Sequence, residues 1–251
     1  MSPLAISSIV FAAMFGCALL GFLLQTILPE HHLSPASQST VNLGMALVGT
    51  MAALLLGLLV ASAESSYDSV NSELTHMSAD VVLLDRMLAH YGSETKEARD
   101  LLRRTVATML DRVWSSNVSS MAKLDPEGGG GEFLFDKIQQ LSPKNDSQRS
   151  IQTQAISMAI SLGQTRWLLF EQSQSSISIT FLVVLVFWLS VLFASFGVFA
   201  PRNLTVIISL LLAALAVSGA IFLMFELTRP FEGLAQVSSA ALRNAFVHLG
   251  R

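Results

Sequence analysis

Acidic residues stand at the ends of the apolar stretches of this sequence, where they could act on ions. Glu64 and Asp68 lie four residues apart after the second stretch, and Glu226, Arg229 and Glu232 follow the fourth. Charges at membrane depth are costly and tend to face a protein interior or a water-filled pathway. Snorkelling to the headgroups explains Arg229 and Glu232 at least equally well. Glu64, Asp68 and Glu226 are therefore the stronger candidates for an interior or an aqueous vestibule.

No other group of residues in the sequence indicates chemistry. His31 and His32 are adjacent in a loop without a third metal ligand, and His76 with Asp80 has the spacing of a surface hydrogen bond on a helix. The glycines at 128–131 are not followed by the Gly-Lys-Ser/Thr of a phosphate-binding loop, which favours a flexible turn. We therefore expect no enzymatic activity, no metal site and no cofactor.

The elements that must position the acids follow from an uneven composition. The chain has 251 residues, of which 52% are hydrophobic and 13% charged, whereas soluble domains carry about 25% charged residues. The missing charge is concentrated in residues 1–63 and 173–228, while residues 64–172 have the composition of a soluble helical region. A net charge of −3 gives no indication of nucleic acid as a partner. Cys17 lies in an apolar stretch and is expected to be a small buried hydrophobic residue.

Four stretches are long enough to cross a bilayer as helices, which takes about 20 apolar residues. They cover residues 3–28, 41–63, 177–200 and 204–225. No Lys or Arg precedes the first, and it exceeds the usual core of a signal peptide, so we interpret it as a retained helix. The predicted fold is an all-α multi-pass membrane protein with four transmembrane helices. Its parts are a helix pair in 1–63, a long helical cytoplasmic excursion in 64–176, a second pair in 177–228 and a cytoplasmic tail in 229–251.

The positive charges predict the orientation of these spans. With four crossings, both termini and residues 64–176 share one side of the membrane. That side holds 14 of the 15 Lys and Arg residues, and the other side holds Arg202. Because cytoplasmic loops carry an excess of Lys and Arg, we expect both termini to be cytoplasmic.

Small residues predict how the spans pack, since close backbone approach favours helix association in lipid. The clearest pattern is in the second span, where every fourth residue of one face is small: Gly49, Ala53, Gly57 and Ala61. The same spacing occurs in the first and fourth spans, at Ala13, Cys17 and Gly21, and at Ala214 and Ser218 or Ala216 and Ala220. The third span carries large aromatic residues around its circumference. We expect spans one, two and four to form the packed set and span three to face lipid.

Beyond residue 63 the apolar residues become periodic. They alternate steps of three and four, as in a coiled-coil seam, at Tyr67, Val70, Leu74, Met77, Val81, Leu84, Leu88 and Tyr91. Gly92 ends this predicted helix, and Ser93 can cap the next one over 93–115. A short helix is expected near 133–141, and a further seam over 151–169 runs on into the third span.

Two regions of the sequence carry a family pattern. The first contains Ser65-Ser66-Tyr67-Asp68, then Val82-Leu83-Leu84-Asp85-Arg86 and Leu88-Ala89-His90-Tyr91-Gly92. The second runs from Phe196-Gly197 through Ala200-Pro201-Arg202-Asn203, Phe222 and Glu226 to Arg229-Pro230-Phe231, Gly233 and Leu242-Arg243-Asn244-Ala245. These runs resemble a widespread bacterial membrane family called bestrophin-like. The resemblance implies kinship to bestrophins, oligomeric anion channels with four membrane helices per subunit and a helical cytosolic portion. A lysine often stands in that pattern where this chain has Glu64, which would reverse the charge at an inner mouth.

The residues and the resemblance together predict a homo-oligomeric ion channel or pore of the bacterial inner membrane. The second span would line it, and the cytoplasmic helices would form a vestibule at its inner mouth. The resemblance implies anions, whereas carboxylates at the mouth favour cations. The alternative is a non-conducting, membrane-anchored scaffold or sensor that acts through its cytoplasmic helices. The expected partners are the lipid bilayer, further copies of the chain and inorganic ions, and nucleic acid is not expected.

Overall fold

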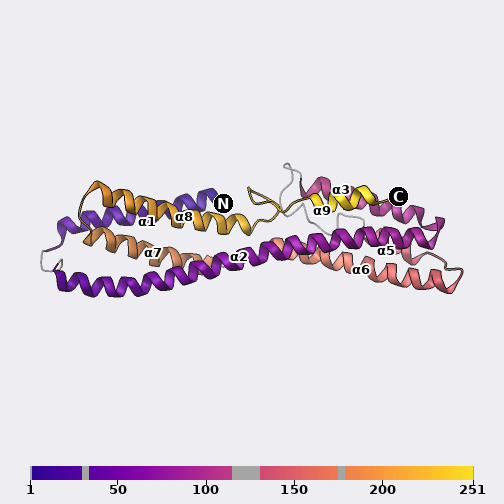
Figure 1. The fold of residues 1–251 in the computed structure, drawn as a ribbon, viewed down its shortest axis with the longest axis horizontal. Coiled ribbons are helices and arrows are strands. Elements are labelled where there is room, and N and C mark those ends of the chain that lie inside the picture. Colours follow the sequence, from indigo (N-terminus) through magenta and orange to yellow (C-terminus); the bar gives the residue numbers. More distant parts are fainter. Residues whose placement is uncertain (1, 30–33, 115–130, 175–178, 251) are drawn as a thin grey trace. The chain divides into compact units, whose positions relative to one another are not determined.

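The computed structural model describes residues 2–29, 34–114, 131–174 and 179–250, and every regular element among them is helical (Figure 1). In chain order these are α1 (Pro3–Ile27), α2 (Pro35–Tyr91), the 3-10 turn η2 (Ser93–Thr95), α3 (Lys96–Val113), α5 (Gly131–Gln139), α6 (Asp146–Gln174), α7 (Ile179–Phe199), α8 (Leu204–Leu227) and α9 (Ala240–His248). Four of them, α1, α2, α7 and α8, are long and apolar enough to cross a membrane. The predicted all-α fold with four apolar helices is confirmed for these residues. The predicted turn at glycines 128–130 and the histidine pair His31 and His32 lie outside the described residues.

The chain divides into two compact units. The first contains Met1–Ser65 and Ser176–Thr228, and the second contains Ser66–Ser175 and Arg229–Arg251. Helix α2 contributes to both as a single helix of 57 residues. It continues past the predicted end of the span because residues 61–67 contain no proline or glycine that would interrupt helical hydrogen bonding.

Helix α1 is the packing centre of the first unit, where it contacts both α7 and α8. Its residues Val10, Met14 and Ala18 recur at every fourth position and are buried. They belong to one apolar cluster with three leucines of α7 and with Ala214 and Ile221 of α8. This arrangement confirms the predicted involvement of Ala214 in helix packing.

Two glycines bring α1 and α7 into backbone contact. A Cβ atom added to Gly21 would lie 2.9 Å from the Cα atom of Gly197, and one added to Gly197 would lie 3.0 Å from the Cα of Gly21. The expectation that the third span faces lipid is therefore wrong. One face of α7 is buried, formed by Leu182, Leu185, Leu189, Leu192, Phe193 and Gly197, while Phe181 and Phe187 are exposed. Leucines at steps of three and four determine the buried face, and the aromatic residues that suggested lipid exposure lie mainly outside it.

The turn between α7 and α8 is fastened to the end of α1. Arg202 donates from Nε to Oε1 of Gln25, at 2.9 Å, and from Nη2 to the carbonyl oxygen of Phe22, at 2.6 Å. Gln25 in turn donates to the carbonyl oxygen of Ala200 at 3.4 Å. A guanidinium group at a helix C-terminus satisfies open carbonyls and complements the helix dipole. The single positive charge of this turn therefore has a structural role.

The second unit is built around the periodic part of α2. Of the eight predicted seam residues, Tyr67 is half-buried and the other seven are buried. The α2 residues share an apolar cluster with residues of α3, α5, α6 and α9, among them Leu102, Leu134, Ala155 and Leu242. The predicted seam is thus a core face against several helices of its own chain, and its pairing as a coiled coil stays a prediction.

The end of α2 is held by side chains from two other segments. Gly92 has a φ of +136°, a conformation that favours glycine, and the Nε2 of Gln148 donates to the carbonyl oxygen of Tyr91 at 2.8 Å. The prediction that Ser93 caps the next helix is wrong, since Ser93 begins η2 and makes no capping bond. Instead Thr95 closes the turn, because its hydroxyl donates to the carbonyl oxygens of Leu88 and Gly92 at 2.5 and 2.8 Å.

Candidate ion pathway

The small-residue strip of α2, defined as Gly49, Ala53, Gly57 and Ala61, is largely uncovered within one chain. Ala53 and Ala61 are exposed, and a Cβ atom added to Gly57 would meet nothing within 4 Å. Gly49 differs, because a Cβ atom there would lie 3.6 Å from Cδ1 of Leu192. Only 6% of the most apolar window of α2 is buried, against 22–28% in α1, α7 and α8. Ala53, Gly57 and Ala61 are thus not packed against another helix of the same chain. Packing of the strip against a neighbouring helix stays a prediction.

A neighbouring face of α2, which the sequence interpretation missed, packs on the first unit. Ala52 and Ala63 are buried in the cluster of that unit, and Leu55, Leu56 and Leu59 lie partly buried against it. Their spacing of three and four residues is the signal that would have indicated this face. Because this face is occupied, the small-residue strip points to another side of the helix.

The acids of the first unit differ in their surroundings. Glu64 is exposed, and it continues the small-residue strip because it lies three residues after Ala61 on the same helix. Glu226, in the last turn of α8, is 6% exposed and makes a polar contact within the protein. Glu226 thus lies in the protein interior, one of the two environments expected for it, and Glu64 is not covered by its own chain.

The remaining candidates belong to the second unit. Asp68 is exposed one turn after Glu64 on α2, and Arg229 and Glu232 are half-buried in the segment that precedes α9. The Glu232 amide N–H donates to the carbonyl oxygen of Arg229 at 3.0 Å, and the Val237 N–H donates to that of Pro230 at 2.7 Å. Residues 229–237 therefore form a loop closed by its own backbone.

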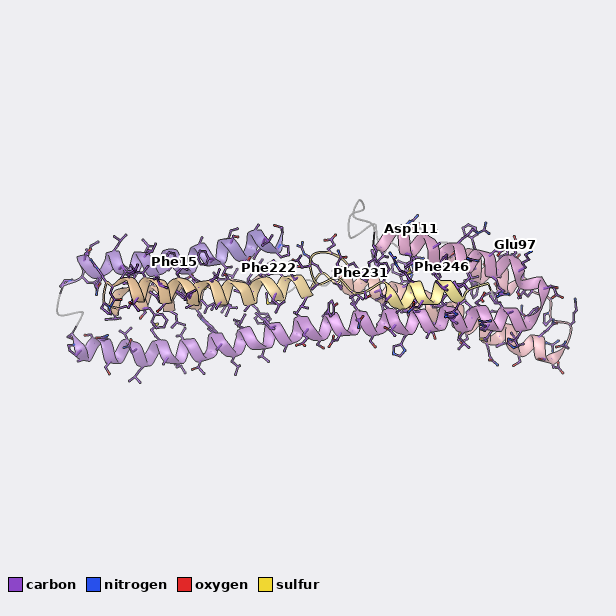
Figure 2. All side chains as sticks on the ribbon, turned by 45° about the horizontal axis from the view of Figure 1, so that its top comes forward. Phe15, Glu97, Asp111, Phe222, Phe231 and Phe246 are labelled. Atoms are coloured by element: carbon purple, nitrogen blue, oxygen red, sulfur yellow. The ribbon has the colours of Figure 1, made fainter. Side chains whose placement is uncertain are left out.

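Two aromatic residues hold this loop against the helices of the second unit. Nε1 of Trp114, just after α3, donates to the carbonyl oxygen of Val237 at 2.9 Å, and the Tyr67 hydroxyl donates to that of Gln236 at 3.4 Å. Phe231 (Figure 2) is buried, and its ring lies edge-on against that of Trp114, with centroids 6.2 Å apart. Arg229 and Glu232 are thus placed by a fixed loop. Sequence reasoning missed Trp114, which has no distinctive sequence pattern.

A buried ion pair organises the other end of the second unit. Asp85 on α2 is 1% exposed and accepts bonds from Nε and Nη2 of Arg99 on α3, at 2.8 and 2.9 Å. The backbone N–H of Gly250 also donates to Asp85, at 3.2 Å. The hydrogen bonds to Asp85 raise the pKa of Arg99 above its ordinary value. Asp85 thus joins α2, α3 and the end of the chain. Its position next to Leu84 in the buried seam is the sequence signal that could have indicated its burial.

Helix α9 is also fastened to α3 by a cation–π contact. The guanidinium carbon of Arg103 lies 5.3 Å from the ring centroid of Phe246, within the range of such interactions.

In the described part of the chain, no group of three or more His, Cys, Asp or Glu side chains is arranged to hold a metal ion. The acids of this candidate pathway would therefore act on ions through their charge.

Comparison with solved structures shows a shared fold. The chain is 14% identical to a bacterial bestrophin homologue from Klebsiella pneumoniae carrying a single tryptophan substitution, with a TM-score of 0.67 over 99% of this chain and 97% of that chain. A second structure of a bestrophin homologue from this organism gives 12% identity and a TM-score of 0.62 over 92% and 95% of the two chains. A third structure, described as a membrane protein, gives 12% identity and a TM-score of 0.62 over 94% of this chain and 96% of that chain. No curated protein matches the sequence.

The sequence also matches a family model over most of its length. The match is to the Bestrophin-like domain and covers residues 12–242. It includes all four apolar helices in whole or in large part, the helices of the second unit from α3 to α6, and the beginning of α9. The predicted resemblance is confirmed, and this chain belongs to the bestrophin-like family of membrane proteins.

Proposed function

We propose that the chain is a subunit of a homo-oligomeric ion channel in the bacterial inner membrane, with α2 lining the pathway. The observation that carries this proposal is the uncovered small-residue strip of α2, which leads through Ala61 to the exposed carboxylate of Glu64. Copies arranged around an axis with Ala53, Gly57 and Ala61 inward would leave space for water and ions between the helices, while Gly49, at the other end of the strip, lies next to Leu192 of α7. The same copies would place a ring of carboxylates at one end of the pathway.

The family supports a channel, and the acids modify which ion it would prefer. The bestrophin resemblance implies anion conduction. Rings of carboxylates instead concentrate cations and repel anions, over a screening length of about 8 Å at physiological salt. Glu64 and Asp68 are exposed on one helix, one turn apart, so they are the groups that would shift the preference of this chain towards cations.

The proposed orientation places both termini and the second unit in the cytoplasm. Fourteen of the 15 Lys and Arg residues would lie on that side, in keeping with the positive-inside tendency. Arg202, on the other side, is engaged with the end of α1. Reporter fusions after Ser34 and after Ser93 should therefore report opposite sides, and a common side would contradict this topology.

A non-conducting scaffold or sensor is the second candidate. It is supported by large apolar side chains exposed on helices of the second unit, including Phe133 on α5 and Trp167 and Leu168 on α6, which are 70%, 53% and 50% exposed. Contiguous exposed apolar patches mark interaction surfaces, and these side chains are the candidates for such a patch. Such a surface would serve a partner protein or a neighbouring copy equally well.

Planar-bilayer recording of the purified protein separates the two functions. A channel gives discrete currents whose reversal potential follows the gradient of a permeant ion when chloride is replaced by gluconate or potassium by a large organic cation. A membrane-inserted oligomer of intact size that carries no current under any of these gradients would refute the channel and leave the scaffold.

A further inference from the structure

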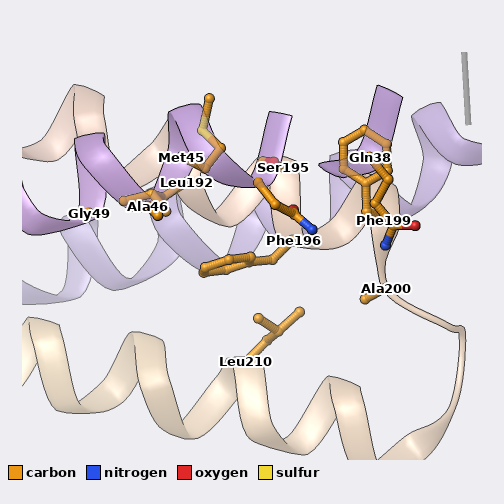
Figure 3. Close-up of a pocket in the computed structure, with 11 residues that line it drawn as sticks. Gln38, Met45, Ala46, Gly49, Leu192, Ser195, Phe196, Phe199, Ala200 and Leu210 are labelled. Atoms are coloured by element: carbon orange, nitrogen blue, oxygen red, sulfur yellow. The ribbon is translucent and has the colours of Figure 1, made fainter. Parts of the chain in front are cut away.

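A groove of about 590 Å³ lies within the first unit, between the beginning of α2 and the end of α7 (Figure 3). Its α2 side is formed by Gln38, Asn42, Met45, Ala46 and Gly49, and its α7 side by Leu192, Ser195, Phe196 and Phe199. Leu210 of α8 closes it from a third direction. The hollow exists because Ala46 and Gly49 leave little side chain on this side of α2. Its volume is within the range of small-molecule binding sites.

The groove contains polar side chains that have no hydrogen-bond partner among the residues that the structure describes. The Ser195 hydroxyl oxygen is buried and has no hydrogen-bond partner among the described residues. Other hydroxyls on these helices, those of Thr50 and Ser218, donate to carbonyl oxygens of their own helices at 2.9 and 3.0 Å. The side-chain amides of Gln38 and Asn42 likewise make no hydrogen bond with the described part of the chain. Asn42 is exposed and Gln38 is half-buried, so the destabilisation caused by a buried, unpaired polar group concerns the Ser195 hydroxyl. A bound group that pairs with this hydroxyl would be favoured.

Polar and apolar residues are segregated along the groove. Gln38, in the first turn of α2, stands next to Phe199 and Ala200 at the end of α7 (Figure 3), and Asn42 follows Gln38 one turn later on α2. Gly49 and Leu192 line the opposite, apolar end, and Ser195 lies between the two. A ligand that fits this pattern has a polar group near the end of the spans and an apolar chain directed towards the middle of the membrane.

We propose that this groove binds one acyl chain of a membrane phospholipid, with its ester and headgroup region at Ser195, Asn42 and Gln38. The ester carbonyl accepts from the Ser195 hydroxyl, and the two amides pair with the polar headgroup. The occupant is a lipid because the groove lies among membrane-spanning helices, where lipid is the abundant amphipathic molecule. An apolar face of a second copy would fill the volume but would leave the three polar groups unpaired in an apolar surrounding. The proposal rests on the membrane location and is independent of ion conduction.

Photo-crosslinking tests the occupant directly. The full-length protein is placed in vesicles of phosphatidylethanolamine and phosphatidylglycerol that contain a phosphatidylethanolamine with a diazirine midway along one acyl chain. After irradiation, mass spectrometry identifies the labelled residues. Label is expected on Met45, Leu192 and Phe196, well above that on residues such as Leu212 and Leu215, which are exposed on α8. Equal labelling of all exposed apolar residues would overturn the proposal, because it would describe ordinary lipid around the helices.

Substitutions then distinguish specific binding of lipid in the groove from non-specific labelling of exposed residues. Ala46→Phe fills the groove and should lose most of the groove label, whereas Ala216→Phe makes the same change on an exposed part of α8 and should retain it. If Ala46→Phe does not fold, Ser195→Ala replaces it, since this change removes only an unpaired hydroxyl. A severalfold weaker groove label at unchanged thermal stability supports the proposal, and unchanged label contradicts it.

A second copy in the groove is the remaining outcome. In a Cys17→Ser background, Met45→Cys and Phe196→Cys would each form disulfide-linked dimers if a neighbouring chain occupied the groove. Efficient dimers together with an unlabelled groove would overturn the lipid proposal. Cysteine variants that form no disulfide-linked dimers, together with a labelled groove, support the lipid proposal.

Discussion

Gly21 of α1 and Gly197 of α7 meet backbone to backbone, so that a Cβ atom on either would lie within about 3.0 Å of the other's Cα. Real side chains do not tolerate such a distance, and the two helices pack as closely as they do because both residues are glycine. Lipid provides no hydrophobic drive for helix association, and this close approach supplies van der Waals contact instead. The crossing fixes α7 against α1 and leaves α2 as the least covered of the four apolar helices.

Gly197→Ala should therefore destabilise the first unit, because the added methyl group collides with the Ala18 carbonyl and the Gly21 backbone. Overpacking of this kind costs about 1–3 kcal/mol. Thermal unfolding in detergent measures the loss. Gly16→Ala is the matched control on α1, since its Cβ atom would meet nothing within 4 Å. Equal stability of the two variants would contradict the close crossing.

Asp85→Asn should destabilise the second unit, because it leaves the Arg99 guanidinium without its carboxylate. Breaking a buried ion pair costs on the order of 3 kcal/mol, and part of this loss is offset here because the Arg99 side chain is 21% exposed. The change should also loosen Gly250, so limited proteolysis should release the C-terminal residues faster. Asp80→Asn, five residues earlier on α2 and half-buried, should have little effect. Similar losses in both variants would show that the pair has no special role.

The ion pair between Glu94 and Lys144, joined at 2.6 Å, predicts a small acid sensitivity of the tip of the second unit. The hydrogen bond from Lys144 lowers the pKa of Glu94 below its ordinary value of 4.5. Because the folded-state pKa is depressed, the contribution of this pair is present above pH 4.5 and is lost as the pH falls through the lowered value. As the pH is lowered from about 6 into the range in which carboxylates titrate, the free energy of unfolding of Glu94→Gln should fall less steeply than that of the wild type. Both groups are exposed, so high salt should abolish this difference between the variant and the wild type. A difference that persists at high salt would show that it does not come from the ion pair.

Gly57→Leu should change the assembly of the protein. The small-residue strip is uncovered at Gly57 within one chain, so a leucine there leaves the chain's own packing intact and acts on contacts between copies or on the width of the pathway. Native mass spectrometry in detergent measures the number of copies, and bilayer recording measures the conductance. Gly219→Leu on α8, another position where an added Cβ atom meets nothing within 4 Å, is the control. Unchanged copy number, stability and conductance would place the strip in lipid.

The sequence predicts the membrane helices well because each is set by local physics. Continuous apolar stretches end at Leu28 and Ala200, within one residue of the observed ends of α1 and α7. Gly92 ends α2 as predicted, since it takes a positive φ. The eight-residue seam from Tyr67 to Tyr91 identifies the core face of α2 in the second unit because burial of a helix face follows its apolar period.

The interhelical contacts could not be predicted, because they depend on which helices become neighbours. Gly21 was recognised as part of a small-residue pattern, but nothing in its surroundings identifies Gly197 as its partner 176 positions later. Asp85 and Arg99 are separated by a helix end, and only the fold shows that the carboxylate is buried. The aromatic residues of α7 suggested a lipid-facing helix, because their number concealed the leucine face. The acids at the helix ends were recognised by type, whereas the burial of Glu226 and the exposure of Glu64 depend on packing.

The reversal potential of the channel tests the central claim most directly. Purified wild type, Glu64→Lys and the control Glu132→Lys, which makes the same charge change at an exposed site on α5, are recorded in planar bilayers under asymmetric KCl. If Glu64 lines the inner mouth of an α2-lined pathway, replacing its ring of carboxylates by ammonium groups shifts the reversal potential towards that of chloride, and more so at low salt. Glu132→Lys should leave it at the wild-type value. Identical reversal potentials for wild type and Glu64→Lys, at matched conductance and copy number, would remove Glu64 from the pathway and contradict the account.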